Sequence, residues 1–172
     1  GCRVPQAAAT ANVEVAASRL VGPPAGIHWP NDVFLGDRKL AGVLVETLAD
    51  GRQILGIGCN VNNSTAGAPA EVARRATSLA DAHGAPLDRT EFFSQLLESL
   101  DAALFRLAAE RAELARAADD LCLQRDKVLN VQLGVERVTG VCAGIADDGG
   151  LKLDTPAGRR TLYSGIVLRD EA

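Results

Sequence analysis

The residues best suited to chemistry are Lys39, Asn60 and Asn62, which lie near two glycines, Gly56 and Gly58. A glycine within a strand often marks the close approach of a ligand or another backbone. A lysine on an apolar face needs an anionic partner or a path to water. An ammonium and two carboxamides beside bare glycines therefore predict a binding floor for a molecule that is apolar at one end and negatively charged near the other.

A β-hairpin is the element that must position these residues. Residues 39–48 and 53–61 are predicted strands, and the Asp-Gly dipeptide between them is favoured as a two-residue hairpin turn. Paired positions would then sum to 101. Because side chains alternate between the faces of a strand, one face is predicted to carry Lys39, Ala41, Val43, Val45, Gly56, Gly58, Asn60 and Asn62. A shorter strand at 33–35 precedes the hairpin, and Gly36 with Asp37 turns it back.

Two segments, WPNDVFLGDRKLAG at 29–42 and GIGCNVN at 56–62, resemble the catalytic domain of biotin protein ligases. Members of that family are expected to carry a Trp-Pro-Asn-Asp turn, a lysine in an Arg-Lys-Leu-Ala-Gly strand, and a Gly-x-Gly-x-Asn strand. The three features in this order and at this spacing are specific. There are two departures: His28 stands where the family commonly has lysine, and nothing matches the Gly/Arg-rich loop that the family uses upstream to hold biotin and phosphate.

The resemblance implies an ATP-dependent ligase whose substrates are biotin and ATP with Mg²⁺. The biotin carboxylate would attack the α-phosphorus of ATP, giving biotinyl-5′-AMP and pyrophosphate. A lysine of the biotin carboxyl carrier protein domain of acetyl-CoA carboxylase would then attack the activated carbonyl. The resemblance makes Lys39 the catalytic candidate, because a fixed cation offsets charge that shifts in both steps. The implied binding residues are Asn31, Asp32, Lys39, Gly42, Val43, Leu44, Gly56, Ile57, Gly58 and Asn60.

Several of these residues also have a plain structural interpretation. Lys39 could be a solvent-exposed lysine that protects a strand edge from aggregation. Asn31 and Asp32 could simply cap their own turn, or they could contact the ribose or help to hold the magnesium that accompanies ATP. His28 is interpreted as a polar residue at the pocket rim, and Trp29 as a packing anchor for the turn.

The remaining segments are predicted to be scaffold. A helix is expected at 5–21 and a short one ending at Gly84, and the resemblance places residues 76–79 near the adenine. Residues 62–69 form either an ordinary loop or a lid over the ligand. Asp88 and Glu91 resemble a capping box. The helix that follows carries a stripe predicted to face the core: Phe92, Phe93, Leu96, Leu97, Leu100, Leu104 and Leu107. A second, more charged helix is expected at 110–121.

From position 127 the pattern changes to short strands separated by Asp-Asp-Gly-Gly and Pro-Ala-Gly turns, which is typical of a small barrel. This part resembles the SH3-like C-terminal domain of the ligases. The predicted class is α+β, with a mixed or antiparallel sheet packed with helices and a small SH3-like β-barrel. We expect a catalytic domain at 1–124 and the barrel at 125–172. The sequence starts with Gly1 and has no methionine, so we expect the first part of the catalytic domain to be missing.

Composition excludes several other classes of protein. The net charge of −4 and the 3% aromatic content argue against a nucleic-acid surface. No apolar run approaches the length of a membrane span. Four scattered cysteines without a Cys-x-x-Cys pair argue against a zinc site and indicate free thiols in a reducing cytoplasm. Because Val61 replaces the third glycine, the segment from Gly56 is not a Rossmann fingerprint.

Two rival functions stay open from the sequence. Lipoate-protein ligases share the fold and chemistry but are expected to carry a different lysine motif. The other rival is a truncated ligase remnant without catalytic competence, and we expect this chain by itself to bind biotin and ATP weakly or not at all. A homodimer is an open alternative for the assembly.

Overall fold

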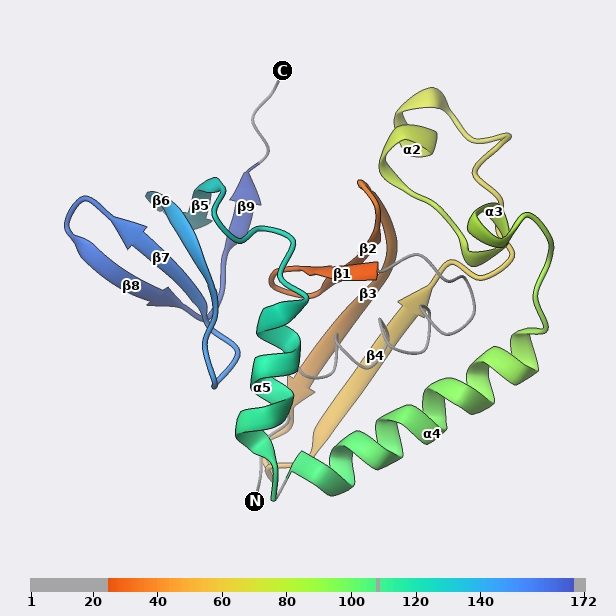
Figure 1. Cartoon of the computed structure of the whole chain (residues 1–172), viewed down its shortest axis with the longest axis horizontal. Helices are drawn as coiled ribbons and strands as arrows, with labels where there is room; N and C mark the ends of the chain where they lie inside the picture. The colour runs from red at the N-terminus through yellow and green to blue at the C-terminus, as the bar shows by residue number, and fades with distance from the viewer. Residues whose placement is uncertain (1–24, 108, 169–172) are drawn as a thin grey trace.

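The computed structural model describes residues 25–107 and 109–168. Two antiparallel sheets are joined by helices, which confirms the predicted α+β class (Figure 1). The elements in chain order are β1 (Ala25–His28), β2 (Asp32–Leu35), β3 (Arg38–Thr47), β4 (Gln53–Cys59), α2 (Ala70–Arg75), α3 (Leu79–His83), α4 (Arg89–Leu107), α5 (Arg111–Asp120), β5 (Val128–Leu133), β6 (Glu136–Ile145), β7 (Leu151–Thr155), β8 (Gly158–Leu162) and β9 (Ile166–Leu168). The helix predicted at 5–21 lies outside the described residues.

The first sheet has the order β1-β2-β3-β4, with each strand antiparallel to the next. The strands predicted for β2, β3 and β4 are confirmed within two residues at each end. Strand β1 was not predicted, because Ala25–His28 is only four residues long and is followed at once by turn residues. Gly36 has a φ of 60°, a left-handed conformation that glycine adopts without penalty, and so closes the β2–β3 hairpin.

The predicted register of the β3–β4 hairpin is wrong by one residue. Gly42 pairs with Gly58 and Leu44 with Gly56, so paired positions sum to 100. The backbone N–H of Leu48 donates to the carbonyl of Arg52 at 2.8 Å, which leaves three residues in the loop instead of two. Gly51 has a φ of 86° and takes the left-handed position that ends such a three-residue loop.

The helices agree in part with the prediction. Ser78 caps α3 by accepting a hydrogen bond from the backbone N–H of Asp81, and Gly84 ends it at a φ of 83°. The carboxylate of Asp88 accepts the backbone N–H groups of Thr90 and Glu91, so α4 is capped as expected. Helix α2 was not predicted.

The stripe on α4 faces the core only in part. Phe92 and Leu96 are 5% exposed, whereas Phe93 is 57% exposed. The exposed members line a groove of about 1140 Å³ between α4 and β4. No helix in the described ranges is long and apolar enough to cross a membrane.

The second sheet has the order β8-β7-β6-β5-β9 and forms the small β-barrel predicted for the C-terminal part of the chain. Residues 159–168, which the sequence predicts as one strand, are divided into β8 and β9, and Gly165 between them has a φ of 138°. The Asp-Asp-Gly-Gly and Pro-Ala-Gly turns are confirmed between β6 and β7 and between β7 and β8.

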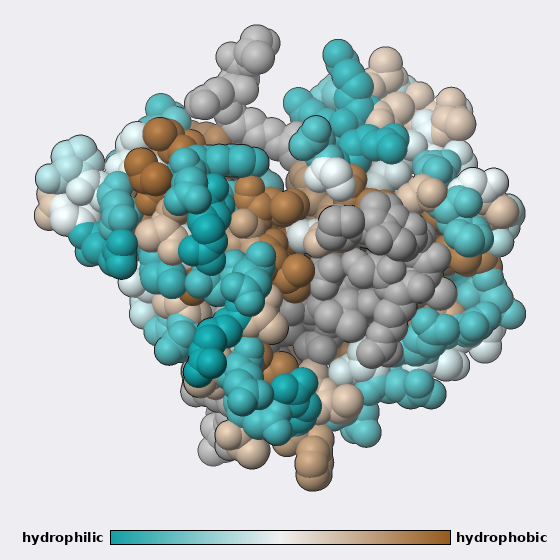
Figure 2. Space-filling view, viewed as in Figure 1, coloured by the Kyte–Doolittle hydropathy of each residue, from teal (hydrophilic) through white to brown (hydrophobic). Residues whose placement is uncertain are grey.

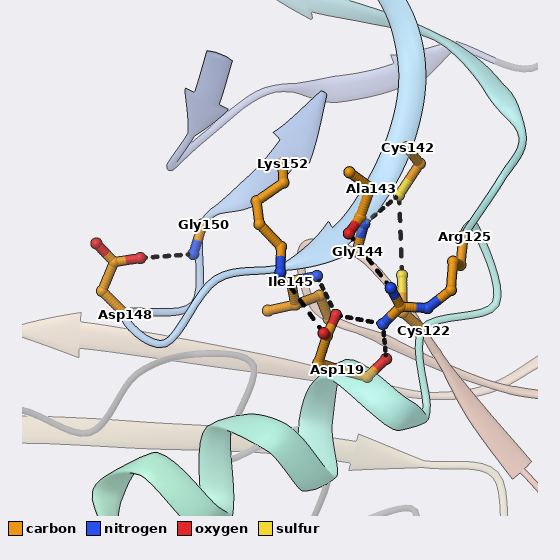
Figure 3. Close-up of polar contacts among 10 residues, drawn as sticks. All are labelled: Asp119, Cys122, Arg125, Cys142, Ala143, Gly144, Ile145, Asp148, Gly150 and Lys152. Carbon is orange, nitrogen blue, oxygen red and sulfur yellow. Dashed lines mark hydrogen bonds and ion pairs between the residues drawn. The ribbon is translucent and has the colours of Figure 1, made fainter. Parts of the chain in front are cut away.

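The barrel is joined firmly to the rest of the chain. One hydrophobic cluster combines Ile27, Trp29 and Ala118 with the barrel interior, and Figure 2 shows hydrophobic side chains gathered between the barrel and the centre of the molecule. At the end of α5, the carboxylate of Asp119 accepts the backbone N–H of Ile145 and pairs with Arg125 at 2.6 Å (Figure 3). These contacts attach α5 to β6, across the position at which we placed the domain boundary.

Candidate active site

Lys39 and Asp32 form an ion pair over the first sheet. Lys39 Nζ lies 2.6 Å from Asp32 Oδ1, and the side chains are 46% and 23% exposed. A Cβ at Gly42 would lie 3.3 Å from Asp32 Oδ1 and 3.5 Å from Lys39 Nζ. The pair therefore rests on the surface that the missing side chain of Gly42 leaves open.

A β-bulge explains why Lys39 reaches this face. Val33 pairs with Ala41 but Phe34 pairs with Lys39, so Leu40 is an extra residue in β3. Leu40 and Ala41 are both buried in the same hydrophobic cluster. A bulge of this kind re-aims the side chain beside it, and Lys39 consequently lies on the same face as Gly42. The shift of the β3–β4 register by one residue would by itself place Lys39 on the face opposite the glycines. The bulge at Leu40 reverses this effect and returns Lys39 to the face predicted for it.

The glycine face, which we define as Gly42, Leu44, Gly56 and Gly58, lies on the side of the hairpin opposite the core. Among the described residues, no atom lies within 4 Å of a Cβ placed at Gly58, and at Gly56 the nearest is Leu44 at 3.9 Å. Leu44 is 53% exposed and supplies the apolar surface of this face. A flat ligand could approach the backbone closely here.

The shift in register changes which other residues belong to this face. Val43, Ala41 and Val45 were predicted to share it, but Val43 and Ala41 are buried in the core and Val45 packs against them. Ile57 also packs against the core. Among the candidate binding residues, Val43 and Ile57 therefore border the glycine face with their backbones only.

The turn at 29–32 carries the other candidates. Asn31 accepts a hydrogen bond from the backbone N–H of Val43 through its carbonyl at 2.8 Å, which fixes the turn to β3. His28 pairs with Asp32 across the β1–β2 hairpin, and its ring stacks on Phe34 with centroids 4.9 Å apart. Trp29 is 2% exposed and belongs to the cluster that contains the barrel interior. Trp29 thus anchors the turn, but against the barrel.

Asn60 and Asn62 were predicted to flank Lys39, but their side chains form hydrogen bonds with backbone groups of other segments. Asn60 Nδ2 donates to the carbonyl of Thr77 at 3.0 Å. Asn62 Nδ2 donates to the carbonyl of Leu87 at 2.8 Å, and its Oδ1 accepts the Leu87 N–H. The Thr77 backbone N–H donates in turn to the carbonyl of Lys39 at 2.9 Å. Residues 76–78 therefore run directly beside the base of Lys39, where the sequence predicted a nucleotide contact.

Asp81 was missed by the sequence analysis and organises the segment at 62–69. It accepts hydrogen bonds from the Ser64 hydroxyl at 2.6 Å and from the Thr65 backbone N–H at 2.9 Å. Together these bonds lower the pKa of Asp81 to about 2, and the bond from Ser64 makes the largest contribution. The segment between β4 and α2 is thus tied to the start of α3. Only the Asn-Ser-Thr composition of the segment hinted at such a bond.

Cys59 does not belong to the candidate chemistry. It packs against the core on the face opposite the glycines, as predicted. Burial raises the pKa of its thiol to about 12, so it is not a nucleophile near neutral pH. Within the described residues, no cluster of His, Cys, Asp and Glu is arranged to hold a metal ion.

Comparison with known families agrees with this arrangement. Residues 7–63 match the biotin/lipoate A/B protein ligase family, and residues 130–169 match the biotin protein ligase C-terminal domain. The chain belongs to the biotin protein ligase family. The first match includes the strands that carry the glycine face, and the second covers most of the barrel, in the order expected from the sequence.

Individual members of the biotin protein ligase family align along most of this chain. The biotin–[acetyl-CoA-carboxylase] ligase of Mycobacterium tuberculosis (strain ATCC 25618 / H37Rv) is 37% identical over 161 residues, which are 92% of this chain and 58% of that protein. The Paracoccus denitrificans ligase of the same description is 32% identical, covering 85% of this chain and 64% of that protein. The chain thus spans little more than half the length of the Mycobacterium tuberculosis relative.

Solved biotin protein ligases share the fold. The apo structure from Aquifex aeolicus superposes with a TM-score of 0.87 at 27% identity, covering 97% of this chain and 76% of that chain. The structure from Aquifex aeolicus in complex with biotin and ATP gives a TM-score of 0.83 at 28% identity, covering 96% and 71%.

Proposed function

We propose that this chain is part of an ATP-dependent biotin protein ligase that forms biotinyl-5′-AMP and transfers the biotinyl group to a lysine of a carrier protein. The observation that carries the proposal is the position of Lys39, whose ammonium lies over a glycine face and is paired with one carboxylate. The Aquifex aeolicus complex with biotin and ATP supports it.

The reaction requires a cation where the two substrates meet. The biotin carboxylate attacks the α-phosphorus of ATP, a new O–P bond forms, and pyrophosphate leaves. The carrier lysine then attacks the acyl carbon, and AMP leaves with the bonding electron pair. Lys39 is proposed as the catalytic residue, because its ammonium can stabilise negative charge on the carboxylate and α-phosphate in both steps.

The glycine face and the turn are proposed to divide the substrates between them. Gly42, Gly56 and Gly58 would let the apolar end of biotin approach the backbone, with Leu44 alongside and the backbones of Val43 and Ile57 at the border. Asn31 and Asp32 would lie at the nucleotide. Mg²⁺ would arrive with ATP, since it binds through few protein carboxylates and the phosphates, and Asp32 is the carboxylate paired with Lys39. Asn60 contributes by holding residues 76–78 beside Lys39.

The carrier is proposed to be the biotin carboxyl carrier protein domain of acetyl-CoA carboxylase, because two relatives are described as ligases of that enzyme. Lipoate is the alternative acid, and the match of residues 130–169 to a domain described for biotin protein ligases favours biotin. Free thiols at Cys59, Cys122 and Cys142 support a cytoplasmic location. A homodimer would show in light scattering as twice the chain mass of 17.9 kDa.

The experiment measures adenylate formation. The 172-residue chain, and in parallel the longest open reading frame that contains it, are incubated with ATP labelled at the α-phosphate and with biotin or lipoate. Labelled biotinyl-AMP is resolved by thin-layer chromatography, and transfer to a carrier domain is followed by mass spectrometry.

We expect the longer product to form biotinyl-AMP and to modify one carrier lysine, and the chain alone to be weak or inactive. If the protein forms the adenylate of lipoate in preference to that of biotin, the proposed substrate is wrong and lipoate takes its place. Absence of any adenylate from both proteins, under conditions in which a known ligase is active, would support the inactive remnant.

We also propose that the chain divides into a catalytic domain at 1–124 and a barrel domain at 125–172. The two separate hydrophobic clusters support this division. Ile27 and Trp29 belong to the barrel cluster although they precede the boundary, so the two units are expected to unfold together.

A further inference from the structure

The turn that carries Asn31 and Asp32 is held from outside its own sheet. The backbone N–H of Trp29 donates to Gln124 Oε1 at 2.7 Å, and the indole Nε1–H donates to the carbonyl of Gly149 at 3.1 Å. Gln124 lies in the linker between α5 and β5, and Gly149 lies in the β6–β7 turn of the barrel. Both tethers come from residues more than 90 positions further along the chain.

Both acceptors are fixed in place. Gln124 is 2% exposed, and the linker beside it pairs with β1: the N–H of Ile27 donates to the carbonyl of Leu121, and the N–H of Leu123 donates to that of Ile27. A Cβ at Gly26 would lie 2.5 Å from the Leu123 side chain, so only glycine leaves room for this linker.

The β6–β7 turn is held by its own bonds as well. The N–H of Gly149 donates to the carbonyl of Ala146 at 2.8 Å. Asp148 accepts bonds from the N–H of Gly150 at 3.2 Å and from the Tyr163 hydroxyl at 2.8 Å; Figure 3 shows the former. The Gly149 carbonyl therefore meets the indole as a rigid acceptor.

The turn that begins at Trp29 ends with Asn31 and Asp32, the two residues proposed to bind the nucleotide. Asn31 is bonded to β3 through the Val43 N–H, and Asp32 pairs with Lys39. We propose that Gln124 and the β6–β7 turn are positioning elements: they hold Trp29 so that Asn31 and Asp32 face Lys39, and the barrel thereby sets the nucleotide side of the site. The catalytic part of this inference rests on the proposed ligase function, whereas the positioning part does not.

The chemistry of Gln124 allows positioning to be separated from stability. Its Nε2 is buried and has no hydrogen-bond partner among the described residues. Gln124→Met has nearly the same shape, and it removes this orphaned donor while leaving the Trp29 N–H without an acceptor. One unsatisfied buried donor is exchanged for another, so stability should change little while the tether is lost. Thr139→Ala is the matched control, because it removes one side-chain bond, to Asn130, on the exposed surface of the same barrel.

The first measurement is independent of enzyme activity. Trp29 is the one tryptophan in the sequence, so its fluorescence reports the junction directly. In Gln124→Met we expect a red-shifted emission, and an exchange rate of the Val43 amide raised about 10-fold, as expected for local opening. Exchange of the Leu153 amide inside the barrel should not change, and Thr139→Ala should behave as the unaltered chain.

The second measurement uses adenylate formation by the longest open reading frame that contains the chain. Gln124→Met and Trp29→Phe should raise KM for ATP about 10-fold, because small misplacements of binding groups have large effects. KM for biotin should stay within about twofold, since the glycine face belongs to β3 and β4 and not to the turn.

The outcomes separate the two proposals. Unchanged emission and unchanged Val43 exchange in Gln124→Met would show that other contacts hold the turn, and would overturn the inference. Equal increases in both KM values would assign the two residues a general structural role and would also overturn it. If the unaltered protein forms no adenylate, the proposed function fails, and the fluorescence and exchange measurements alone decide whether the tether positions the turn.

Discussion

Two aspartates of similar exposure, Asp32 and Asp119, pair with cations in different parts of the molecule. Their side chains are 23% and 22% exposed, and each lies 2.6 Å from a cationic nitrogen. Asp32 Oδ1 accepts no hydrogen bond from the described residues beyond its ion pair with Lys39. Asp119 binds Arg125, accepts the Ile145 N–H, and lies 3.5 Å from Lys152 (Figure 3).

The number of partners distinguishes the two sites. Burial opposes ionisation of Asp119, but the bonds from Arg125 and the Ile145 N–H and the charge of Lys152 together lower its pKa. Asp119 must break its contacts with three groups to move, whereas Asp32 breaks one contact among the described residues when it exchanges Lys39 for another cation. The Asp119 cluster is therefore a structural clip, and the Asp32–Lys39 pair needs fewer contacts to be broken before it opens.

The largest expected effect is on catalysis at the pair that opens. If the proposed function holds, Lys39→Ala in the product of the longest open reading frame that contains the chain should reduce biotinyl-AMP formation about 10²–10³-fold, because a preorganised cation is lost. Folding should be preserved, since a partly exposed ion pair contributes at most about 1 kcal/mol. Adenylation rate and the urea midpoint are measured together. Arg52→Ala is the control, because it removes an exposed cation at the other end of the same hairpin; near-normal turnover in Lys39→Ala would rule out the catalytic assignment.

The clip should show the opposite behaviour. Asp119→Ala leaves the Ile145 N–H without its acceptor and the Arg125 guanidinium with backbone carbonyls but no carboxylate, so the free energy of unfolding should fall by about 2–3 kcal/mol. Asp32→Ala should lose less than about 1 kcal/mol of unfolding free energy, because Lys39, its ion-pair partner among the described residues, can turn to water. Urea denaturation of both variants gives the comparison. Equal losses would mean that partner number does not distinguish the two sites.

A glycine substitution tests whether the open face receives a ligand. The methyl group added in Gly58→Ala meets no atom of the described residues within 4 Å, so stability should be unchanged. If biotin lies against the backbone there, the added methyl group should raise KM for biotin about 10-fold, in line with the penalty for overpacking a close contact. Steady-state kinetics with biotin and ATP varied separately provide the measurement. An unaltered KM for biotin would place the ligand elsewhere.

The sequence predicted the strands and their turns but not their exact pairing. An Asp-Gly dipeptide fits both a two-residue and a three-residue loop, and only the Leu48–Arg52 hydrogen bond decides between them. The bulge at Leu40 depends on packing, since Leu40 and Ala41 both face the core. Two adjacent apolar residues before Gly42 were the only signal of it. Lys39 was predicted on the same face as Gly56 and Gly58, and the structure confirms this. The prediction holds because the one-residue shift of the β3–β4 register and the bulge at Leu40 offset each other.

Contacts across long separations were beyond the sequence pattern. Trp29 was predicted to anchor its own turn, whereas its partners Gln124 and Gly149 come from the linker and the barrel. The stripe on α4 was predicted as core because periodicity shows that a helix is amphipathic but not how much of its apolar face is covered. Phe93 illustrates this, since it is 57% exposed beside the groove.

Asp81 allows the effect of the number of hydrogen-bond partners on stability to be separated from the effect of burial. The change in stability expected from it is the smallest of those predicted. Asp81 is partly exposed, but bonds from Ser64 and Thr65 lower its pKa to about 2 from the ordinary 3.8. A carboxyl whose pKa is lowered on folding stabilises the folded state above its unfolded pKa, and this contribution is lost as pH falls. Asp81 should therefore contribute stability at neutral pH that disappears between about pH 4 and pH 2.

Urea denaturation of the unaltered chain and of Asp81→Asn between pH 5 and pH 2 tests this expectation. The two stability curves should converge as pH falls through that window, because protonation of Asp81 removes what the substitution removes at neutral pH. Ser64→Ala should lie between them, since Thr65 still donates to the carboxylate. Parallel curves would mean that Asp81 titrates alike in both states. The number of hydrogen-bond partners would then not explain why Asp81 stays ionised. The same explanation for the difference between Asp119 and Asp32 would also lose its support.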